Sequence, residues 1–466
     1  MQVLITIALV IIGVLLFELI IFCHEFGHFI TAKRSGVQVN EFALGMGPKL
    51  FSFKRGETTY SLRAFPIGGF CAMEGEDEQS DNPRAFTNAK TWKRMIIIVA
   101  GAFMNFVLGF ILMFVVVVQA PGYESNTISG FVPYSNTAAT GLKAGDQVVS
   151  IDGLPIWNAR DLMFGIQTTR EKEVDADSLT VYIEDCTMQA TLAYSDFINL
   201  ERSESEALSD ELQNELIAAL GKGCDEIRAA STKDEAYRLM QKTVDAIYTV
   251  SGEAKPKDFK YPVIEKRDRR LRHVADVKVI RDGEELTLKD VHFYSYYKDE
   301  EAQKKSKSSV GIDFYVEPIE KNFFTVIQQT GSQTITLAKS VWQSLIMLVQ
   351  GRFSFNDLSG PVGITKAVSV VASEGLKTGF GDAVNNIIFI MALITVNLGI
   401  VNMLPFPALD GGRFVFLCVE AIIRKPLPRK FEYIVNAVGL AILIGFIIVI
   451  SVKDVWQLIT GNFPSL

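Results

Sequence analysis

Two histidines and a glutamate near the start of the chain have the spacing used by metal-dependent hydrolases. His24 and His28 bound the sequence His-Glu-Phe-Gly-His, at the end of an apolar run that starts near Val3. On a helix the two imidazoles lie one turn apart on one face, so both can reach the same metal ion. Glu25 is then placed to polarise a metal-bound water. The pattern predicts hydrolytic water chemistry inside a lipid bilayer.

The third metal ligand is expected from another part of the chain, because zinc in a hydrolase usually takes three protein ligands and leaves one position for water. The other two histidines, His273 and His292, lie in the region predicted outside the membrane and cannot reach the motif. Asp410, in Asn-Met-Leu-Pro-Phe-Pro-Ala-Leu-Asp-Gly, is the candidate carboxylate. Glu18, about two turns deeper than Glu25 on the same face, could orient a ligand, relay protons or pair with a polar group, and it stays outside the predicted catalytic set.

The two halves of this site are expected at the same depth. His28 lies five residues before Lys33, about 7.5 Å along a helix axis, and Asp410 lies three residues before Arg413. The two prolines before Asp410 break the helix, and non-helical backbone at this depth requires burial in protein or a wet cavity. The alternative is that Asp410 only caps a helix after the proline turn.

The composition indicates membrane helices combined with a soluble part. The 466 residues are 48% hydrophobic, with a mean hydropathy of +0.22. A net charge of -7, without a basic cluster in the soluble part, gives no support to nucleic-acid binding. The five cysteines include no Cys-x-x-Cys pair, so a cysteine zinc site is not expected. Pairing of Cys186 with Cys224 is left open.

Four segments are apolar and long enough to span a bilayer, at about Val3–Ile30, Met95–Val118, Ala383–Leu404 and Tyr433–Val452. The first lacks the basic leader of a cleavable signal peptide and is expected to be retained. A further stretch, about Phe323–Val349, is interrupted by polar residues and is predicted to lie on the membrane or against the bundle. Basic residues concentrate after the first span and between the last two, so both loops are expected in the cytosol, with both termini and residues 120–380 outside.

Residues 37–71 are predicted to form a β-hairpin or small sheet beside the active site. Strand-like runs at Val37–Phe53 and Thr58–Phe70 are broken by glycines and proline. An unpaired edge of such a sheet could bind an extended peptide by strand addition. The alternative is a flexible cytosolic loop.

The outer region begins with alternating apolar strands around Gly141-Leu142-x-x-Gly145-Asp146, which resembles a PDZ domain. Strand patterns resume at Val274–Ile280 and Val310–Tyr315. Leucines between these strands mark one helical face, at Leu208, Leu212, Leu216 and Leu220. Thr232 with Glu235 indicates a capping box that opens a second helix. We predict a helical insertion in the PDZ-like domain, and the alternative is a disordered acidic loop.

Taken together, the motifs resemble those of the site-2 intramembrane zinc metalloproteases, and most closely the bacterial RseP/RasP (regulator of sigma-E protease) branch. The resemblance rests on the two-part zinc motif and the PDZ-like segment, and it covers about residues 1–153 and 310–460. Further matching pieces are Phe42-x-x-Gly45-x-Gly47-Pro48, Pro66-x-Gly68-Gly69-Phe70, Asn105-Phe106 and Leu358-Ser359-Gly360-Pro361-Val362-Gly363-Ile364. Two features depart from the family: the stretch Gly101 to Asn105 lacks the usual Gly-Pro, and one PDZ domain is expected instead of two.

The resemblance implies that His24, His28 and Asp410 bind one Zn²⁺ per chain and that Glu25 is the general base. It implies substrate contacts at Asn402, Gly45, Gly47, Pro405 and Pro407. The implied substrates are single-pass membrane proteins already trimmed by another protease, such as anti-sigma factors and signal-peptide remnants. The PDZ-like domain would act as a size filter, and the lipid bilayer rather than nucleic acid is the other expected partner. The implied location is the bacterial inner membrane.

The expected fold is a multi-pass α-helical membrane protein with a membrane-associated β-loop and an extracytoplasmic PDZ-like α+β domain. The expected order is a first transmembrane helix (1–36), the β-loop (37–92), a second helix (93–120), the PDZ-like domain (121–318, with its insertion at about 187–272), outer amphipathic linker helices (319–380), a third helix with the aspartate motif (381–412) and a fourth helix (430–453). The competing functions are a catalytically silent PDZ membrane adaptor and a metal transporter. Intact metal and base residues argue against the adaptor, and the lack of repeated halves argues against the transporter.

Overall fold

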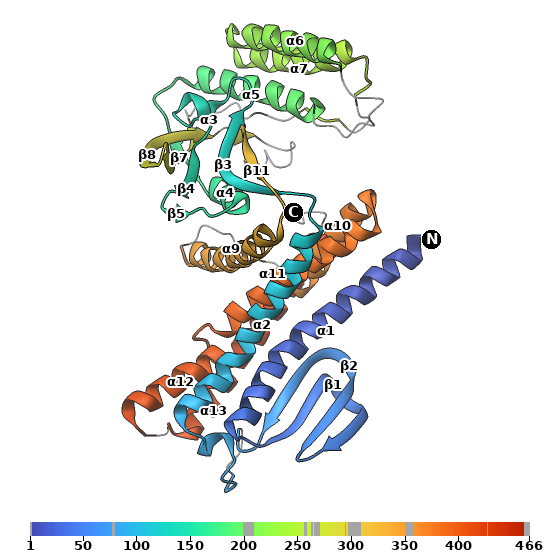
Figure 1. Cartoon of the computed structure of the whole chain (residues 1–466), viewed down its shortest axis with the longest axis vertical. Helices are drawn as coiled ribbons and strands as arrows, with labels where there is room; N and C mark the ends of the chain where they lie inside the picture. The colour runs from blue at the N-terminus through green and yellow to red at the C-terminus, as the bar shows by residue number, and fades with distance from the viewer. Residues whose placement is uncertain are drawn as a thin grey trace. The chain divides into compact units, whose positions relative to one another are not determined.

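The chain divides into two units in the computed structural model (Figure 1). One unit combines Met1–Pro121 with Asn322–Leu466, and the other is Gly122–Lys321. The structure describes residues 2–76, 80–198, 209–255, 259–261, 264, 271–293, 295–296, 309–350, 358, 360–425 and 427–460. Of the predicted motif residues, Leu208 and Ser359 lie outside these ranges.

Four long apolar helices build the first unit: α1 (Gln2–Ser35), α2 (Thr91–Gln119), α11 (Phe380–Asn402) and α13 (Arg429–Ile459). Among the described residues, these four are long and apolar enough to cross a membrane, as expected for a multi-pass membrane protein. Helix α11 ends at Asn402 rather than at the predicted Leu404. The reason is that Leu404 precedes Pro405, whose ring disfavours helical backbone at the residue before it.

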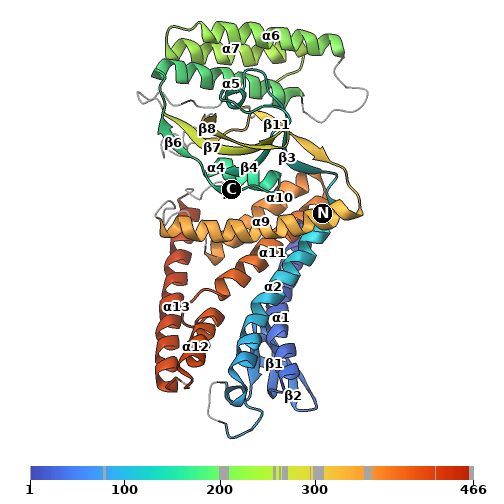
Figure 2. The ribbon, with the colours of Figure 1, turned by 60° about the vertical axis from the view of Figure 1, so that its left-hand side comes forward.

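Helix α2 packs against both α1 and α11, and Figures 1 and 2 show α1 beside α2. Glycines permit the close approach of these helices. A Cβ added at Gly27 would lie 2.3 Å from the carbonyl oxygen of Ala100, and one added at Gly109 would lie 2.6 Å from the side chain of Val396. The backbone of α2 is thereby fixed closely against the helices on either side of it.

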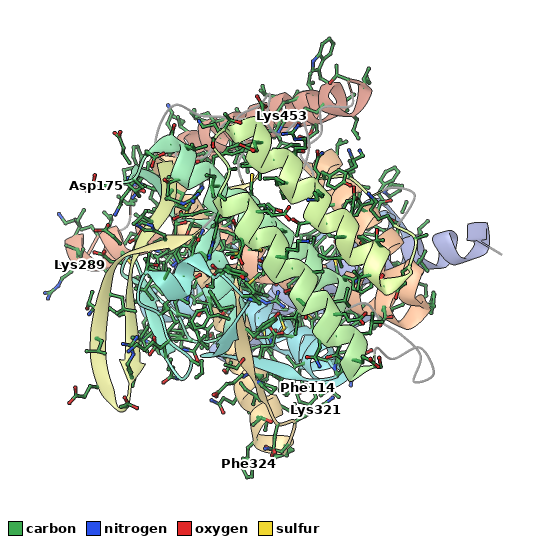
Figure 3. The ribbon with its side chains drawn as sticks, turned by 90° about the horizontal axis from the view of Figure 1, so that it is seen from above. Phe114, Asp175, Lys289, Lys321, Phe324 and Lys453 are labelled. Atoms are coloured by element: carbon green, nitrogen blue, oxygen red, sulfur yellow. The ribbon has the colours of Figure 1, made fainter. Side chains whose placement is uncertain are left out.

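The part of this unit that the structure describes also contains the α-helices α9 (Phe323–Val349), α10 (Pro361–Thr378) and α12 (Asp410–Ile423). Helix α9 crosses and packs against α2 and α11 (Figure 2). It turns polar side chains such as Thr330 and Gln343 inward, whereas Phe324 and Trp342 are exposed. Figure 3 shows Phe324 at the start of this helix. The stretch predicted to lie on the membrane or against the bundle thus packs against two helices of the bundle, and its buried side chains include polar ones.

A small antiparallel sheet follows α1. Its strands are β1 (Val39–Arg55) and β2 (Thr58–Met73), where the sequence predicted strands at 37–53 and 58–70. The register is more complex than a simple hairpin, because Phe42 lies opposite both Cys71 and Tyr60, while Tyr60 also lies opposite Phe53. Each long strand therefore folds back on itself, and together the two strands form four adjacent rows of backbone.

Glu41 holds this folded-back sheet together. Its carboxylate accepts hydrogen bonds from Ser61 at 2.6 Å and Arg63 at 2.8 Å, both on β2, and from Lys49 of β1 at 3.0 Å. Burial alone would raise the pKa of Glu41, but these three donors outweigh it and lower the pKa to about 2. Arg63 also donates to the carbonyl of Gly47 at 2.8 Å, which closes the fold-back turn.

A seven-stranded sheet forms the core of the second unit, in the order β11-β3-β4-β7-β6, with β5 paired to β4 and β8 paired to β7. The strands are β3 (Tyr123–Phe131), β4 (Gln147–Ile151), β5 (Leu154–Pro155), β6 (Arg170–Glu173), β7 (Leu271–Arg281), β8 (Glu284–Phe293) and β11 (Phe314–Ile319). Strands β9 (Ser295–Tyr296) and β10 (Ser309–Val310) pair separately, and α3 (Asn136–Ala139) and α4 (Ala159–Gln167) are short helices.

The Gly-Leu-x-x-Gly-Asp turn predicted at 141–146 is closed by its aspartate. Asp146 is fully buried and accepts hydrogen bonds from the backbone N–H of Lys143 at 2.8 Å and from Arg281 of β7 at 2.6 Å. Burial would raise the pKa of Asp146, but the Arg281 guanidinium outweighs it and lowers the pKa. The turn is thereby tied to the centre of the sheet.

Between β6 and β7 in the chain, the described residues include the helices α5 (Ser178–Ile198), α6 (Asp210–Arg228) and α7 (Lys233–Ser251). Seen from above, α6 and α7 lie side by side (Figure 3). The helical segment begins at Ser178, earlier than the expected boundary near 187, because Asp177 accepts the backbone N–H groups of Leu179 and Thr180 at 2.9 Å.

The predicted start of α7 differs in one detail. Thr232 accepts the backbone N–H of Glu235 at 3.2 Å, but Glu235 reaches back to the N–H of Ser231, at 2.8 Å, instead of that of Thr232. Cys186 and Cys224, whose pairing was left open, are both buried free thiols in one apolar cluster of these helices.

Candidate metal centre

The structure brings His24, His28 and Asp410 together in the first unit. The Nε2 atoms of the two histidines are 3.2 Å apart. Asp410 Oδ2 lies 3.2 Å from Nε2 of His24 and 3.3 Å from Nε2 of His28. Both histidines are only 8% exposed, and Asp410 Oδ2 is buried without a satisfied hydrogen bond among the described residues. The two parts of the sequence motif therefore form one cluster of possible metal ligands.

The geometry of this cluster fits a tetrahedral zinc ion. With metal–ligand bonds of about 2.0–2.1 Å, neighbouring ligand atoms around tetrahedral zinc lie about 3.3 Å apart. The three ligand atoms form a triangle with sides of 3.2, 3.2 and 3.3 Å. Two imidazoles and a carboxylate are also a donor set that catalytic zinc uses, and they leave its fourth position for water or substrate.

The turn between α11 and α12 delivers Asp410, the first residue of α12. In this turn Ala408 has a φ of 71°, and its N–H donates to Asn436 of α13 at 3.1 Å. A Cβ added at Gly411 would lie 2.2 Å from the carbonyl oxygen of Leu404, so the residue after Asp410 has to be glycine. The proline-containing turn and the glycine together fix the start of α12.

Helix α2 contributes the outer partners of both imidazoles. Nδ1 of His28 lies 2.8 Å from the carbonyl oxygen of Ile97, and Nδ1 of His24 lies 3.2 Å from the Asn105 amide. Between these two partners, a Cβ added at Gly101 would lie 2.3 Å from Nε2 of His28. One face of α2 therefore both orients the histidines and leaves room for them.

Sequence reasoning missed the roles of Gly101 and Asn105. Both were noted only as parts of a family pattern. A signal was present, because Asn105 is the one polar side chain between Met95 and Val118, and polar residues inside membrane spans tend to be functional. Its spacing of four from Gly101 also places the two on one helix face.

Glu25 lies on α1 beside the last part of β2. A Cβ added at Gly69 would lie 3.5 Å from Cγ of Glu25 and 2.9 Å from the carbonyl oxygen of Ala43. Glycine at this position therefore lets the strand pass close to the predicted base. Glu18 has a buried Oε1 without a hydrogen-bond partner among the described residues, and it does not belong to the three-ligand cluster.

Of the predicted substrate-contacting residues, Asn402 lies at the metal centre. Its Nδ2 is 3.4 Å from Nε2 of His24, the nitrogen that forms one corner of the ligand triangle. Gly45 and Gly47 adopt φ values of 76° and 86°, which gives them a backbone role in the fold-back turn of β1. Pro405 and Pro407 lie in the turn before Asp410, and Pro407 packs so tightly on α13 that a Cβ at Gly439 would lie 2.4 Å from it.

Comparison with known proteins places this arrangement in a family. The model described as peptidase family M50 matches residues 12–446. The zinc metalloprotease RasP of Bacillus licheniformis is 32% identical over 458 residues, which covers 96% of this chain and 98% of that protein. The regulator of sigma-W protease RasP of Bacillus subtilis is 28% identical over 459 residues, covering 96% and 97% of the two chains. Because the family match includes both halves of the ligand cluster, from His24 to Asp410, this chain belongs to peptidase family M50.

Proposed function

We propose that this chain, a metalloendopeptidase of family M50, uses Zn²⁺ to cleave the transmembrane segments of single-pass membrane proteins. The observation that carries the proposal is the ligand triangle of His24, His28 and Asp410, with sides of 3.2–3.3 Å, inside a unit built from helices that can span a membrane. The relatives named as zinc metalloproteases support the choice of metal.

His24 and His28 would hold the metal through Nε2, and Asp410 would hold it through Oδ2. Bound there, Zn²⁺ would polarise the carbonyl of the scissile peptide and make a nearby water acidic enough to attack at neutral pH. The carboxylate of Glu25 takes the proton of that water and delivers it to the leaving nitrogen. The Asn402 amide, 3.4 Å from His24 Nε2, is placed to donate a hydrogen bond to the carbonyl oxygen as negative charge develops on it.

The substrate must be extended at the cleaved bond, because a peptide bond in a helix is hydrogen-bonded and sterically covered. We infer that it adds as a strand to residues 69–73 of β2, whose other side pairs with β1. This row passes Glu25 at Gly69, so strand addition there would bring a peptide to the base. Backbone pairing would also compensate for the helical hydrogen bonds that the substrate loses. Gly45 and Gly47 would support this by shaping the sheet.

The second unit is proposed to be an extracytoplasmic PDZ-like domain with α5–α7 as its insertion. It would act as a size filter that admits substrates already shortened by another protease. The supporting pattern is the distribution of basic residues: by the positive-inside rule it predicts both termini and this unit outside, and the ligand cluster towards the cytosolic side of a bacterial inner membrane. The relative named as a regulator of sigma-W protease is in accord with substrates of the anti-sigma-factor kind.

The decisive experiment measures zinc content and cleavage together in the purified full-length chain. The variants are Glu25→Gln, Asp410→Ala and, as a matched control on the same helix, Glu18→Gln. We expect Glu25→Gln to keep its zinc and to lose cleavage of a model transmembrane peptide, because only the proton carrier is removed. Asp410→Ala should lose zinc as well as cleavage. Glu18→Gln should retain both.

The same measurement separates the competing functions. A catalytically silent adaptor would show no cleavage even in the wild type. Cleavage by Glu25→Gln at the wild-type rate would remove Glu25 from the mechanism, and an unchanged zinc content in Asp410→Ala would reassign the third ligand.

A further inference from the structure

One face of α2 serves the two histidines of the metal centre in a regular way. Ile97, Gly101 and Asn105 follow one another at intervals of four residues, so they lie along one stripe of the helix. Ile97 places its carbonyl oxygen beside His28, and Asn105 places its amide beside His24. Gly101, between them, has no side chain and so leaves room for the two imidazoles. The stripe therefore supplies one Nδ1 partner to each of the two rings.

The partner of Nδ1 determines which nitrogen of a histidine can bind metal. A neutral imidazole that binds through Nε2 carries its proton on Nδ1, and that proton needs an acceptor. His28 meets this requirement, because the Ile97 carbonyl at 2.8 Å can only accept. The equivalent acceptor for His24 has to come from Asn105, the side chain that lies 3.2 Å from its Nδ1.

The Asn105 amide can supply that acceptor at little cost. Its Nδ2 faces the ring, while its Oδ1 is buried without a hydrogen-bond partner among the described residues. A half-turn of the amide exchanges the two atoms without breaking a hydrogen bond of Oδ1, and it lets Oδ1 accept the proton of His24 Nδ1.

Asn105 lies in the packed contact between α2 and α11. The side chain is fully buried. Thr395 of α11 donates its hydroxyl to the backbone carbonyl of Asn105 at 3.2 Å, and a Cβ added at Gly399 would lie 3.4 Å from Cβ of Asn105. Helix α11 therefore contacts the backbone and the Cβ of Asn105 rather than its amide, and the same helix ends at Asn402, whose amide lies near Nε2 of the same ring.

We propose that Asn105 is a positioning residue of the metal centre: it accepts the Nδ1 proton of His24 and so keeps Nε2 free for the metal. The inference rests on the proposed zinc function. It assigns different tasks to the two asparagines that flank His24. Asn105 acts on the ring from the Nδ1 side, whereas Asn402 lies on the Nε2 side and faces the reacting atoms.

The test measures zinc affinity by competition with a chelator, and the visible spectrum of the Co²⁺-substituted protein, on the full-length chain. Asn105→Leu keeps the size of the side chain but removes the acceptor, and we expect zinc affinity to fall about 10–100-fold with an altered Co²⁺ spectrum. Asn105→Asp restores an acceptor, and its affinity should stay within about threefold of the wild type. Asn402→Leu should keep the zinc affinity and lose cleavage.

Two controls separate orientation of the ring from packing of the helices. Thr395→Val removes the bond between α11 and α2 while leaving the Asn105 amide, and Asn385→Leu removes another buried amide of α11. Both should bind zinc as the wild type does. The proposal is overturned if Asn105→Leu binds zinc with wild-type affinity. It is also overturned if either Asn105→Asp or Thr395→Val loses as much zinc affinity as Asn105→Leu.

The outcome also distinguishes this inference from the proposed function. If the wild type binds no zinc, both fail. If the wild type binds zinc and Asp410→Ala weakens it, but Asn105→Leu does not, the function stands and only the role of Asn105 is wrong.

Discussion

The carboxylate of Asp454, near the end of α13, caps the start of α10 by accepting the backbone N–H of Gly360 at 2.8 Å. It also accepts the N–H of Gly363 at 2.9 Å. Asp454 is fully buried, and a Cβ at Gly360 would lie 3.1 Å from it. Lys453, labelled in Figure 3, lies 3.1 Å from the second carboxylate oxygen and donates to the carbonyl of Leu358. This contact gives the glycine-proline motif at 360–363 a structural purpose.

Removing this cap should destabilise the first unit. In Asp454→Ala two buried N–H groups lose their acceptor, which costs about 1–3 kcal/mol for each donor left unsatisfied. We expect a lower thermal unfolding temperature for the detergent-solubilised chain. The control is Asp382→Ala, which removes an exposed carboxylate in the first turn of α11 and should leave the temperature nearly unchanged. Equal temperatures for wild type and Asp454→Ala would show that the cap contributes nothing.

A methyl group at position 101 should disturb the metal centre directly. In Gly101→Ala the new Cβ would lie 2.3 Å from His28 Nε2 and 2.8 Å from Cε1 of His24, so the two rings must move apart. Zinc binding and peptide cleavage should both be lost. Gly13→Ala, on α1, is the control, since a Cβ there meets nothing within 4 Å. Wild-type zinc content in Gly101→Ala would contradict the close packing of α2 on the histidines.

The sheet after α1 should loosen in acid. The donors around Glu41 hold its folded-state pKa at about 2, below the ordinary 4.5 of an unfolded chain. Because the pKa of Glu41 is lower in the folded state, its carboxylate stabilises the folded sheet fully at pH values above about 4.5. This stabilisation is lost as the pH falls from about 4.5 to about 2. Hydrogen exchange of residues 39–73 at pH 6 and pH 3 should show this loss of protection.

The matched variant for that experiment is Glu41→Gln. It should already exchange faster at pH 6 and should change less between the two pH values. Hydrogen bonds from Arg84 and Lys33 lower the pKa of Glu57 to about 2, so Glu57 titrates in the same range. Because Glu57 is present in both proteins, the difference between them isolates Glu41. An identical pH dependence in the two proteins would exclude a role for Glu41.

The second unit should depend on the buried cation of β7. Arg272 is 1% exposed, pairs with Asp185 and Glu184 of α5, and donates to the Val181 carbonyl at 2.8 Å. Arg272→Ala removes the cation from beside the buried carboxylate of Asp185, and breaking a buried ion pair from one side costs about 3–5 kcal/mol. Hydrogen exchange in α5 and β7 of the full-length chain should accelerate strongly.

An exposed ion pair on the same strand provides the comparison. Lys278 pairs with Glu285 at 3.0 Å, with both side chains about half exposed. Lys278→Ala should cost less than about 1 kcal/mol, because solvent screens exposed pairs. If the two variants changed exchange equally, the Arg272 cluster would not be what ties α5 to the sheet.

The sequence by itself determined the parts of this protein that follow from local periodicity and depth. The spacing of His24, Glu25 and His28 predicts that they lie on one helix, and the four apolar segments predict four spanning helices. Asp410 could be selected because no further histidine was within reach, and because basic residues soon after both His28 and Asp410 predict a similar depth for the two. These signals need only neighbouring residues of the chain, so they survive without knowledge of the fold.

Only the tertiary structure decided how distant segments meet. The doubled pairing of Phe42 with Cys71 and Tyr60, the cap that Asp454 provides, and the contact of Asn105 with His24 each join residues far apart in the chain. No local period encodes such contacts, because strand register and helix-to-helix approach depend on which surfaces are buried together. The sequence could therefore name the candidate metal ligands, but only the packing of α2 against α1 showed which groups lie beside the Nδ1 atoms of the two histidines.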